Sequence, residues 1–137
     1  MNTKQLQLVT FEQAVRLKKL GFDWETTESY DAFLQTLQPL NPFPRNFNDK
    51  VYTVNGHALA SAPTVALALE WVRENWLLAD WLDFSGEYDE DGEPRFYSNY
   101  LFGKEPRKTS KKAMPRKSIE SALLDELLNV LEKEEKQ

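Results

Sequence analysis

The sequence predicts an α+β fold in which three helices pack on a small, mainly antiparallel sheet that includes an aromatic hairpin. Three segments carry apolar residues at helical spacing, and the segments between them contain short runs of strand-forming residues. Most connections are compatible with antiparallel pairing. With 137 residues, the chain has the length of one domain, so we expect a single domain over residues 1–137.

The first helix is predicted at residues 11–20. Thr10 and Gln13 have the spacing of a capping box, in which each side chain satisfies a free backbone N–H of the other residue. Gly21 stands where a helix ends, because glycine tolerates the left-handed conformation. We expect Phe22 to pack back beneath this helix.

The following stretch combines extended segments with a stiff loop. Residues 31–37 fit either a strand or a helical turn. Prolines at positions 39, 42 and 44 lack a backbone donor and restrict their neighbours, so they predict a loop. Phe43 and Phe47 are its expected anchors.

A short strand at residues 51–54 is followed by a predicted tight turn. Asn55 and Gly56 both accept positive φ, which favours a two-residue hairpin connection. His57 comes next, and a histidine acting as a general base needs a nucleophile and an orienting carboxylate. The sequence identifies neither, so we interpret His57 as a turn or surface residue.

The second helix is predicted at residues 64–76. Pro63 suits its beginning, and Ser61 or Thr64 is a suitable cap. Apolar residues then recur on one wide face, while the charged residues fall on the other side.

A hairpin is predicted from residues 81–85 and 95–102, with Asp91-Gly92 in the turn between them. Acidic residues at positions 87, 89 and 91 match the first half of an EF-hand calcium loop. Ser98 stands where that loop needs a bidentate glutamate, so we interpret the segment as a hairpin tip and expect no calcium site.

Aromatic residues near the hairpin allow two interpretations. Tryptophans at positions 71, 76 and 81 suit a stacking platform for single-stranded nucleic acid, but the first two lie on the apolar side of the second helix and are interpreted as core. Strand alternation is only partly kept across residues 95–102, so some aromatics must face outward or toward another chain. The candidate interface residues are Tyr88, Tyr97 and Tyr100.

Residues 104–117 form a predicted basic loop with seven basic residues and one acidic residue. The candidate residues for binding an anion or nucleic acid are Lys104, Arg107, Lys108, Lys111, Lys112, Arg116 and Lys117. The alternative, which we favour, is a solvated loop that partly neutralises the acidic segments on either side.

The last helix is expected to begin after Ser118 as its cap, and the acidic tail 132–137 is expected to fray. Basic residues before a helix N-terminus oppose its dipole, and a bound anion would relieve that conflict.

Composition excludes several kinds of chemistry. The chain has no cysteine and one histidine, which removes thiolate metal sites, cysteine nucleophiles and any multi-histidine metal site within one chain. We expect no metal and no cofactor. The net charge of −5 argues against a general nucleic-acid coat protein. The sequence shows neither a signal peptide nor a membrane-spanning stretch, so we expect a cytoplasmic protein with no membrane partner.

Two stretches carry a resemblance. TFEQAVRLKKLGF at residues 10–22 and SAPTVALALEWVREN at residues 61–75, followed by an aromatic hairpin and a terminal helix, resemble a group of small uncharacterised proteins of gut Bacteroidales and their phages or prophages. This resemblance implies the fold and a mobile-element setting in a bacterial host cell. The group carries no assigned activity, so the resemblance implies no site residue. The chain departs from the group at residues 24–60 and 104–117.

The leading hypothesis is a non-catalytic accessory protein of a phage or prophage that binds a protein partner, with a homodimer as one form of this. The surplus of aromatic residues and the apolar last helix favour it. One alternative is a nucleic-acid-associated protein that uses the basic loop 104–117. Another is a small enzyme with an unrecognised carboxylate site, and we expect the protein not to be an enzyme.

Overall fold

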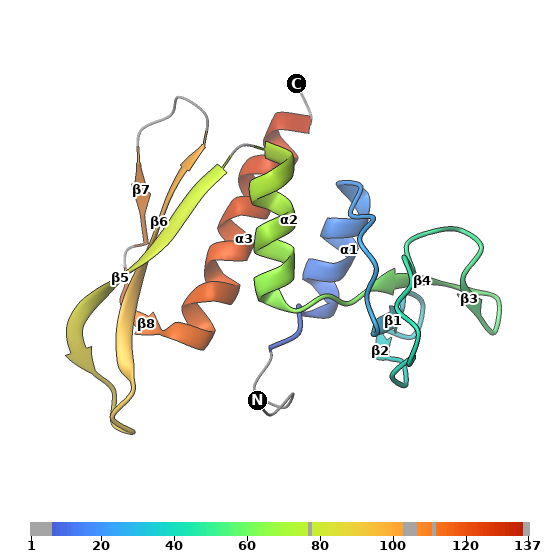
Figure 1. The fold of residues 1–137 in the computed structure, drawn as a ribbon, viewed down its shortest axis with the longest axis horizontal. Helices are drawn as coiled ribbons and strands as arrows, with labels where there is room; N and C mark the ends of the chain where they lie inside the picture. The colour runs from blue at the N-terminus through green and yellow to red at the C-terminus, as the bar shows by residue number, and fades with distance from the viewer. Residues whose placement is uncertain (1–6, 77, 103–106, 111, 136–137) are drawn as a thin grey trace. The chain divides into compact units, whose positions relative to one another are not determined.

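The computed structural model describes residues 7–76, 78–102, 107–110 and 112–135. Within these ranges the chain forms three helices and eight strands, which confirms the α+β class (Figure 1). The chain separates into two compact units, which we call unit 1 (residues 1–68 and 128–137) and unit 2 (residues 69–127). The described strands form two four-stranded sheets, where the sequence predicted one small sheet. The single domain over residues 1–137 stays a prediction.

Unit 1 begins with helix α1 (Phe11–Lys19), and its predicted capping box is confirmed. The Gln13 backbone N–H donates to Thr10 Oγ1 at 3.2 Å, and the Thr10 N–H donates to Gln13 Oε1 at 2.9 Å. Gly21 has a φ of 97°, which a residue with a side chain rarely adopts. Phe22 follows and is only 1% exposed, so it belongs to the core.

The sheet of unit 1 is antiparallel and has the strand order β2-β1-β4-β3. The strands are β1 (Ser29–Asp31), β2 (Thr36–Leu37), β3 (Thr53–Val54) and β4 (His57–Ser61). Residues 31–37 were predicted to form either a strand or a helical turn, and each alternative is partly right. A turn over residues 32–35 joins β1 to β2. Asn55 and Gly56 have φ values of 50° and 79°, which confirms the tight turn between β3 and β4.

The proline-rich loop has one anchor, where the sequence predicted two. Phe47 is 5% exposed and its ring packs edge-on against Tyr52 at a centroid distance of 5.5 Å. The expectation for Phe43 was wrong, because its side chain is 65% exposed. The physical reason is that Phe43 lies between Pro42 and Pro44, and its ring lies 5.8 Å from the guanidinium of the nearby Arg45 instead of entering the core.

Helix α2 (Val65–Trp76) begins in unit 1 and ends in unit 2. Thr64 acts as the predicted cap, because its Oγ1 accepts the backbone N–H of Leu67 at 3.1 Å. The helix starts one residue later than predicted, and it ends as predicted at Trp76.

Unit 2 contains a long hairpin of β5 (Leu78–Tyr88) and β6 (Pro94–Phe102), visible in yellow and orange in Figure 1. The register runs from Leu78 opposite Phe102 to Phe84 opposite Phe96, and it shifts before Tyr88 pairs with Pro94. Gly92 has a φ of 81°, consistent with the predicted Asp-Gly turn. The hairpin extends beyond the strand bounds expected from the sequence.

The expectation that residues 104–117 form a loop throughout was wrong. Strands β7 (Lys108–Thr109) and β8 (Met114–Pro115) both pair with β6. Hydroxyl groups help to hold β7: the Ser98 N–H donates to Ser110 Oγ, and Thr109 Oγ1 donates to Asn99 Oδ1. Residues 103–106 and 111 lie outside the described residues.

Helix α3 (Arg116–Glu135) begins two residues before Ser118, so the predicted cap was wrong. The chain passes from Pro115 at the end of β8 directly into the helix, and Ser118 lies within the first turn. Within the described part of the tail the chain is helical to Glu135, and fraying of residues 132–137 stays a prediction. Arg16 pairs with Glu132 and donates to Asn129 Oδ1 at 2.6 Å.

The apolar side of α3 is buried. Six residues on it are at most 2% exposed: Ile119, Leu123, Leu124 and Leu127 in unit 2, and Leu128 and Leu131 in unit 1. None of the described helices combines the length and the apolar composition that crossing a bilayer needs.

Candidate functional site

The sequence predicted that the basic residues act as one cluster, but in unit 2 the described ones have different neighbours. The Arg107 guanidinium lies 5.6 Å from the centre of the Trp81 ring. Lys108 and Lys112 line a hollow, and Arg116 pairs with Glu120 at 3.1 Å on the surface of α3. Lys104 and Lys111 lie outside the described residues, and so does the side chain of Lys117.

The hollow beside Lys108 and Lys112 has a volume of about 580 Å³ and carries both signs of charge. Asp125 and Glu126 stand among its lining residues with the two lysines. The Tyr100 hydroxyl lies 3.4 Å from Glu126 Oε2. Because carboxylates and ammonium groups line the same space, the basic residues described here do not form a purely cationic anion site. Its lining residues are Ser98, Tyr100, Lys108, Thr109, Ser110, Lys112, Met114, Ile119, Ala122, Asp125 and Glu126.

The three candidate interface tyrosines do not lie together. Tyr100 is 7% exposed and faces the hollow just described. Tyr97 is half-buried and lies on the other face of the sheet from Tyr100. The two residues are three positions apart on β6, and successive side chains of a strand point to opposite faces. Tyr88 is 63% exposed near the turn of the hairpin. Of the three, Tyr88 is therefore the side chain most open to a partner.

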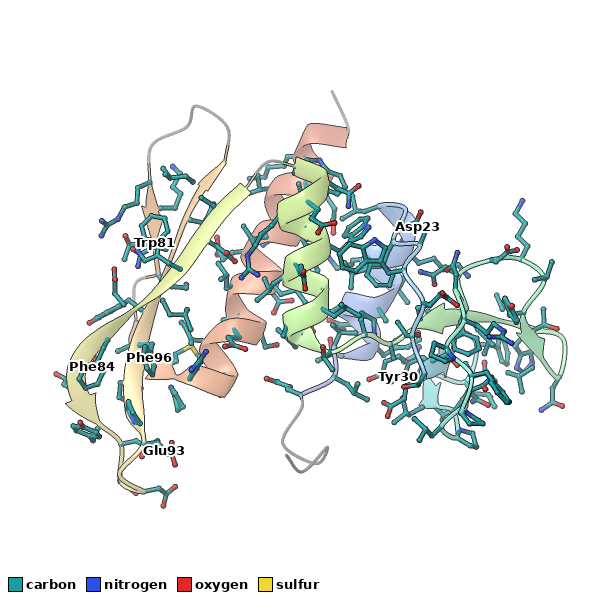
Figure 2. All side chains as sticks on the ribbon, viewed as in Figure 1. Asp23, Tyr30, Trp81, Phe84, Glu93 and Phe96 are labelled. Carbon is teal, nitrogen blue, oxygen red and sulfur yellow. The ribbon has the colours of Figure 1, made fainter. Side chains whose placement is uncertain are left out.

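Tyr88 forms an aromatic cluster with Phe84 and Phe96. The sequence did not identify these two phenylalanines as interface residues. The Phe84 ring lies 5.6 Å from the Tyr88 ring and 5.8 Å from the Phe96 ring. Phe84 is 50% exposed. Figure 2 shows Phe84 and Phe96 near the turn end of the hairpin, with Glu93 beyond them. We call Phe84, Tyr88 and Phe96 the hairpin cluster.

The tryptophans divide between core and surface. Trp71 is 2% exposed and packs edge-on against Trp76, with ring centroids 5.1 Å apart. Trp81 is half-buried on β5, on the same face of the hairpin as Tyr97, and the Arg107 guanidinium approaches its ring. The core interpretation is confirmed for Trp71, and a three-tryptophan platform does not form because Trp71 is buried.

His57 in unit 1 has a carboxylate partner that the sequence did not identify. Its Nδ1 lies 3.0 Å from Asp31 Oδ2, and the Phe33 ring lies 4.8 Å from the imidazole ring. Asp31 Oδ1 also accepts the backbone N–H groups of Phe33 and Leu34 at 2.9 and 3.0 Å. The pair thus ties the turn after β1 to the start of β4. Among the described residues, Asp31 is the group that hydrogen-bonds to the His57 side chain.

The Asp31 carboxylate is expected to stabilise the folded chain by an amount that decreases in acid. The hydrogen bond with His57, followed by the N–H of Leu34, lowers the pKa of Asp31. A carboxyl group with a lower pKa in the folded chain stabilises it above the unfolded pKa of about 3.9, and this contribution is lost as the pH falls through the folded pKa. We therefore expect Asp31→Asn to lower the urea midpoint at about pH 7, and the gap to wild type to narrow toward about pH 3.

Asp23→Asn is the control for this experiment, because Asp23 is exposed. Its urea midpoint is expected to follow that of the wild type across the same pH range. A gap between Asp31→Asn and wild type that stays constant down to about pH 3 would contradict the role of the Asp31 charge.

The acidic segment of the hairpin forms its turn, as predicted. Asp89 Oδ1 accepts the backbone N–H groups of Asp91 and Glu93, both at 2.9 Å. The Gly92 N–H donates to the Asp89 backbone carbonyl at 3.0 Å. Within the described ranges, no three histidine, aspartate or glutamate residues gather as a metal site would need.

Comparison of the chain with protein family models, with curated proteins and with solved structures found no match.

Proposed function

We propose that the protein is a non-catalytic interaction module that binds another protein through the hairpin of β5 and β6. The observation that carries this proposal is the hairpin cluster, in which Phe84 and Tyr88 are 50% and 63% exposed while their rings contact each other. Burying apolar surface is worth about 25 cal/mol per Å², so a partner that covers these rings gains free energy. Aromatic side chains are also enriched among the residues that dominate binding energy.

The backbone of β5 supports the same surface. Within the described residues, β5 stands at the end of its sheet and pairs only with β6. A strand in that position presents one row of unpaired N–H and C=O groups, to which an extended segment of a partner can add. β5 spans Leu78–Tyr88, so this row ends at the hairpin cluster.

Charge favours a basic partner over a second copy of β5. The strand carries Asp80, Asp83 and Glu87 and no basic residue, and the turn adds four more acidic residues at positions 89–91 and 93. Arg73 pairs with Asp80 and the Asn99 amide donates to Asp83, whereas Glu87 is exposed. Antiparallel pairing of two copies of β5 would bring acidic residues together, which is unfavourable.

The proposal includes a role as an accessory protein of a phage or prophage in the cytoplasm of its bacterial host. Its basis is the resemblance of residues 10–22 and 61–75 to the Bacteroidales and phage group.

The test is affinity capture from the lysate of a gut Bacteroidales host, with sedimentation of the purified protein in parallel. We expect the double variant Phe84→Ser/Tyr88→Ser to lose partners that the wild type retains, with affinity about 30-fold lower or more. Phe33→Ser/Leu34→Ser is the matched control, because it removes side chains that are 73% and 57% exposed in unit 1. Identical partners and affinities for the hairpin variant and the wild type would contradict the proposal. Sedimentation shows whether the partner is a second copy.

A second candidate, association with nucleic acid, is favoured by Arg107 over Trp81. A cation beside an aromatic ring suits a stacked base and its phosphate. Fluorescence anisotropy with labelled single-stranded DNA and RNA separates the two candidates. Salt-sensitive binding by the wild type that is lost in the triple variant Lys108→Glu/Lys111→Glu/Lys112→Glu would favour nucleic acid. If the wild type does not bind either probe at low salt, the nucleic-acid candidate is wrong.

A further inference from the structure

We infer that the free edge of β5 binds an extended peptide as an additional antiparallel strand, and that this peptide carries a lysine or arginine between two apolar residues. The inference rests on the proposed function, because it names the kind of partner segment that the hairpin binds. Three observations on β5 lead to it: the direction of its backbone groups, the exposed Phe84 side chain and the Asp83 carboxylate.

Hydrogen bonds of β6 show which backbone groups of β5 point toward β6. The Ser98 N–H donates to Ser110 Oγ at 2.9 Å, and the Ser98 carbonyl accepts the Ser110 N–H at 2.8 Å. Ser110 follows β7, which lies on the side of β6 opposite to β5. The backbone groups of successive residues in an antiparallel strand point to alternate sides, so those of Tyr97 point toward β5. Tyr97 is opposite Asp83, and these two residues therefore form a hydrogen-bonded pair.

The backbone groups of Leu82 and Phe84 consequently point away from β6. These two residues flank Asp83, and the register is regular from Leu78 to Phe84. Within the described residues β5 pairs with β6 alone, so no strand meets the N–H and C=O groups of Leu82 and Phe84. A peptide that lies antiparallel beside β5 can exchange two hydrogen bonds with each of these residues.

The exposed Phe84 side chain favours apolar residues in the peptide. Residues directly opposite each other on neighbouring strands place their side chains on the same face. Peptide residues opposite Leu82 and Phe84 therefore lie on the face that carries the Phe96 ring, whose centre is 5.8 Å from that of the Phe84 ring. Phe84 is 50% exposed, so apolar side chains at these two positions bury surface that is now in water.

The Asp83 carboxylate favours a basic residue between the two apolar ones. Asp83 is exposed on the other face of β5 and accepts a hydrogen bond from the Asn99 amide at 2.8 Å. None of the ion pairs among the described residues involves Asp83, whereas Asp80 is paired with Arg73. A lysine or arginine opposite Asp83 makes a favourable cross-strand pair. A second copy of β5 cannot supply it, because the strand has no basic residue.

The test is an NMR titration of the full chain combined with amide hydrogen exchange. The probe is acetyl-Thr-Leu-Lys-Leu-Thr-amide, and a peptide with glutamate in place of lysine is the charge control. We expect the lysine peptide to slow exchange of the Leu82 and Phe84 amides about tenfold or more, whereas the Asp83 amide, already bonded to β6, changes little. The lysine peptide should bind about tenfold more tightly than the glutamate peptide. Unchanged exchange at Leu82 and Phe84 would overturn strand addition, and equal affinity of the two peptides would overturn the choice of a basic residue.

Methylated peptides test the backbone contribution without changing the protein. N-methyl groups on both leucines of the lysine peptide remove the N–H donors that face Leu82 and Phe84, so affinity is expected to fall about tenfold. N-methylation of the lysine is the matched control, because its N–H points away from β5, and affinity should change by less than about twofold. The same loss of affinity in both methylated peptides would contradict the strand geometry.

Variants of the protein separate this inference from the proposed function. Asp83→Asn is expected to remove the preference for the lysine peptide over the glutamate peptide, whereas Asp23→Asn, at an exposed position of unit 1, should keep it. If partners captured from the lysate depend on Phe84 and Tyr88 but methylation of the leucines has no effect, strand addition is wrong and the proposed function stands. If the peptides bind as expected but capture does not depend on Phe84 and Tyr88, the proposed function is wrong and the peptide site on β5 stands.

Discussion

Replacing Phe47 with alanine is expected to lower the free energy of unfolding by about 3–5 kcal/mol. Phe47 is 5% exposed and contacts the Tyr52 ring, so truncation removes a buried aromatic side chain and leaves a cavity. The same loop contains the matched control Phe43→Ala, whose side chain is 65% exposed. That variant is expected to stay within about 1 kcal/mol of wild type, the size of an exposed cation–π contact.

Urea denaturation followed by far-UV circular dichroism measures both variants under the same conditions. The informative quantity is the difference between Phe47→Ala and Phe43→Ala, because both remove the same atoms from one loop. Similar losses in the two variants would mean that Phe47 is not the anchor of the proline-rich loop.

Replacing Trp71 with alanine is the second large effect, with an expected loss of about 3–5 kcal/mol. Trp71 is 2% exposed within α2 and packs against Trp76. Trp81→Ala is expected to cost clearly less, because Trp81 is half-buried and an exposed cation–π contact such as that with Arg107 is worth about 0.5–1 kcal/mol.

Tryptophan fluorescence adds an independent check on this pair of variants. Removing the buried Trp71 should shift the remaining emission to longer wavelength, whereas removing the half-buried Trp81 should shift it in the opposite direction. Equal stability losses in the two variants would contradict the division of the tryptophans into core and surface.

Local signals predicted the elements whose residues lie close together in sequence. Thr10 with Gln13, and Asn55 with Gly56, act through bonds and φ values that depend on their immediate neighbours, and both predictions are confirmed. The start of α3 was missed because Ser118 is a better capping residue than Pro115, although β8 delivers the chain into the helix earlier. The strands at residues 108–109 and 114–115 were missed because they depend on pairing with β6.

The candidate sites depend on contacts that no local pattern encodes. Asp31 and His57 are 26 positions apart and meet because β1 pairs with β4. The exposure of Phe84 likewise depends on the length of the hairpin and on its register. The composition of a strand alone does not show which of its aromatic side chains are covered.

The pairing of the strands also sets an order in which the chain can fold. Tyr88 and Pro94 close a loop of a few residues, and beyond the register shift β6 can pair with β5 one residue at a time, starting from Phe84 and Phe96. Pairing of β1 with β4 must first bring together residues as far apart as Asp31 and Leu59, which costs more loop entropy. Nascent chains should therefore complete local hairpins early, and the step that joins β1 to β4 should set the pace for the N-terminal half.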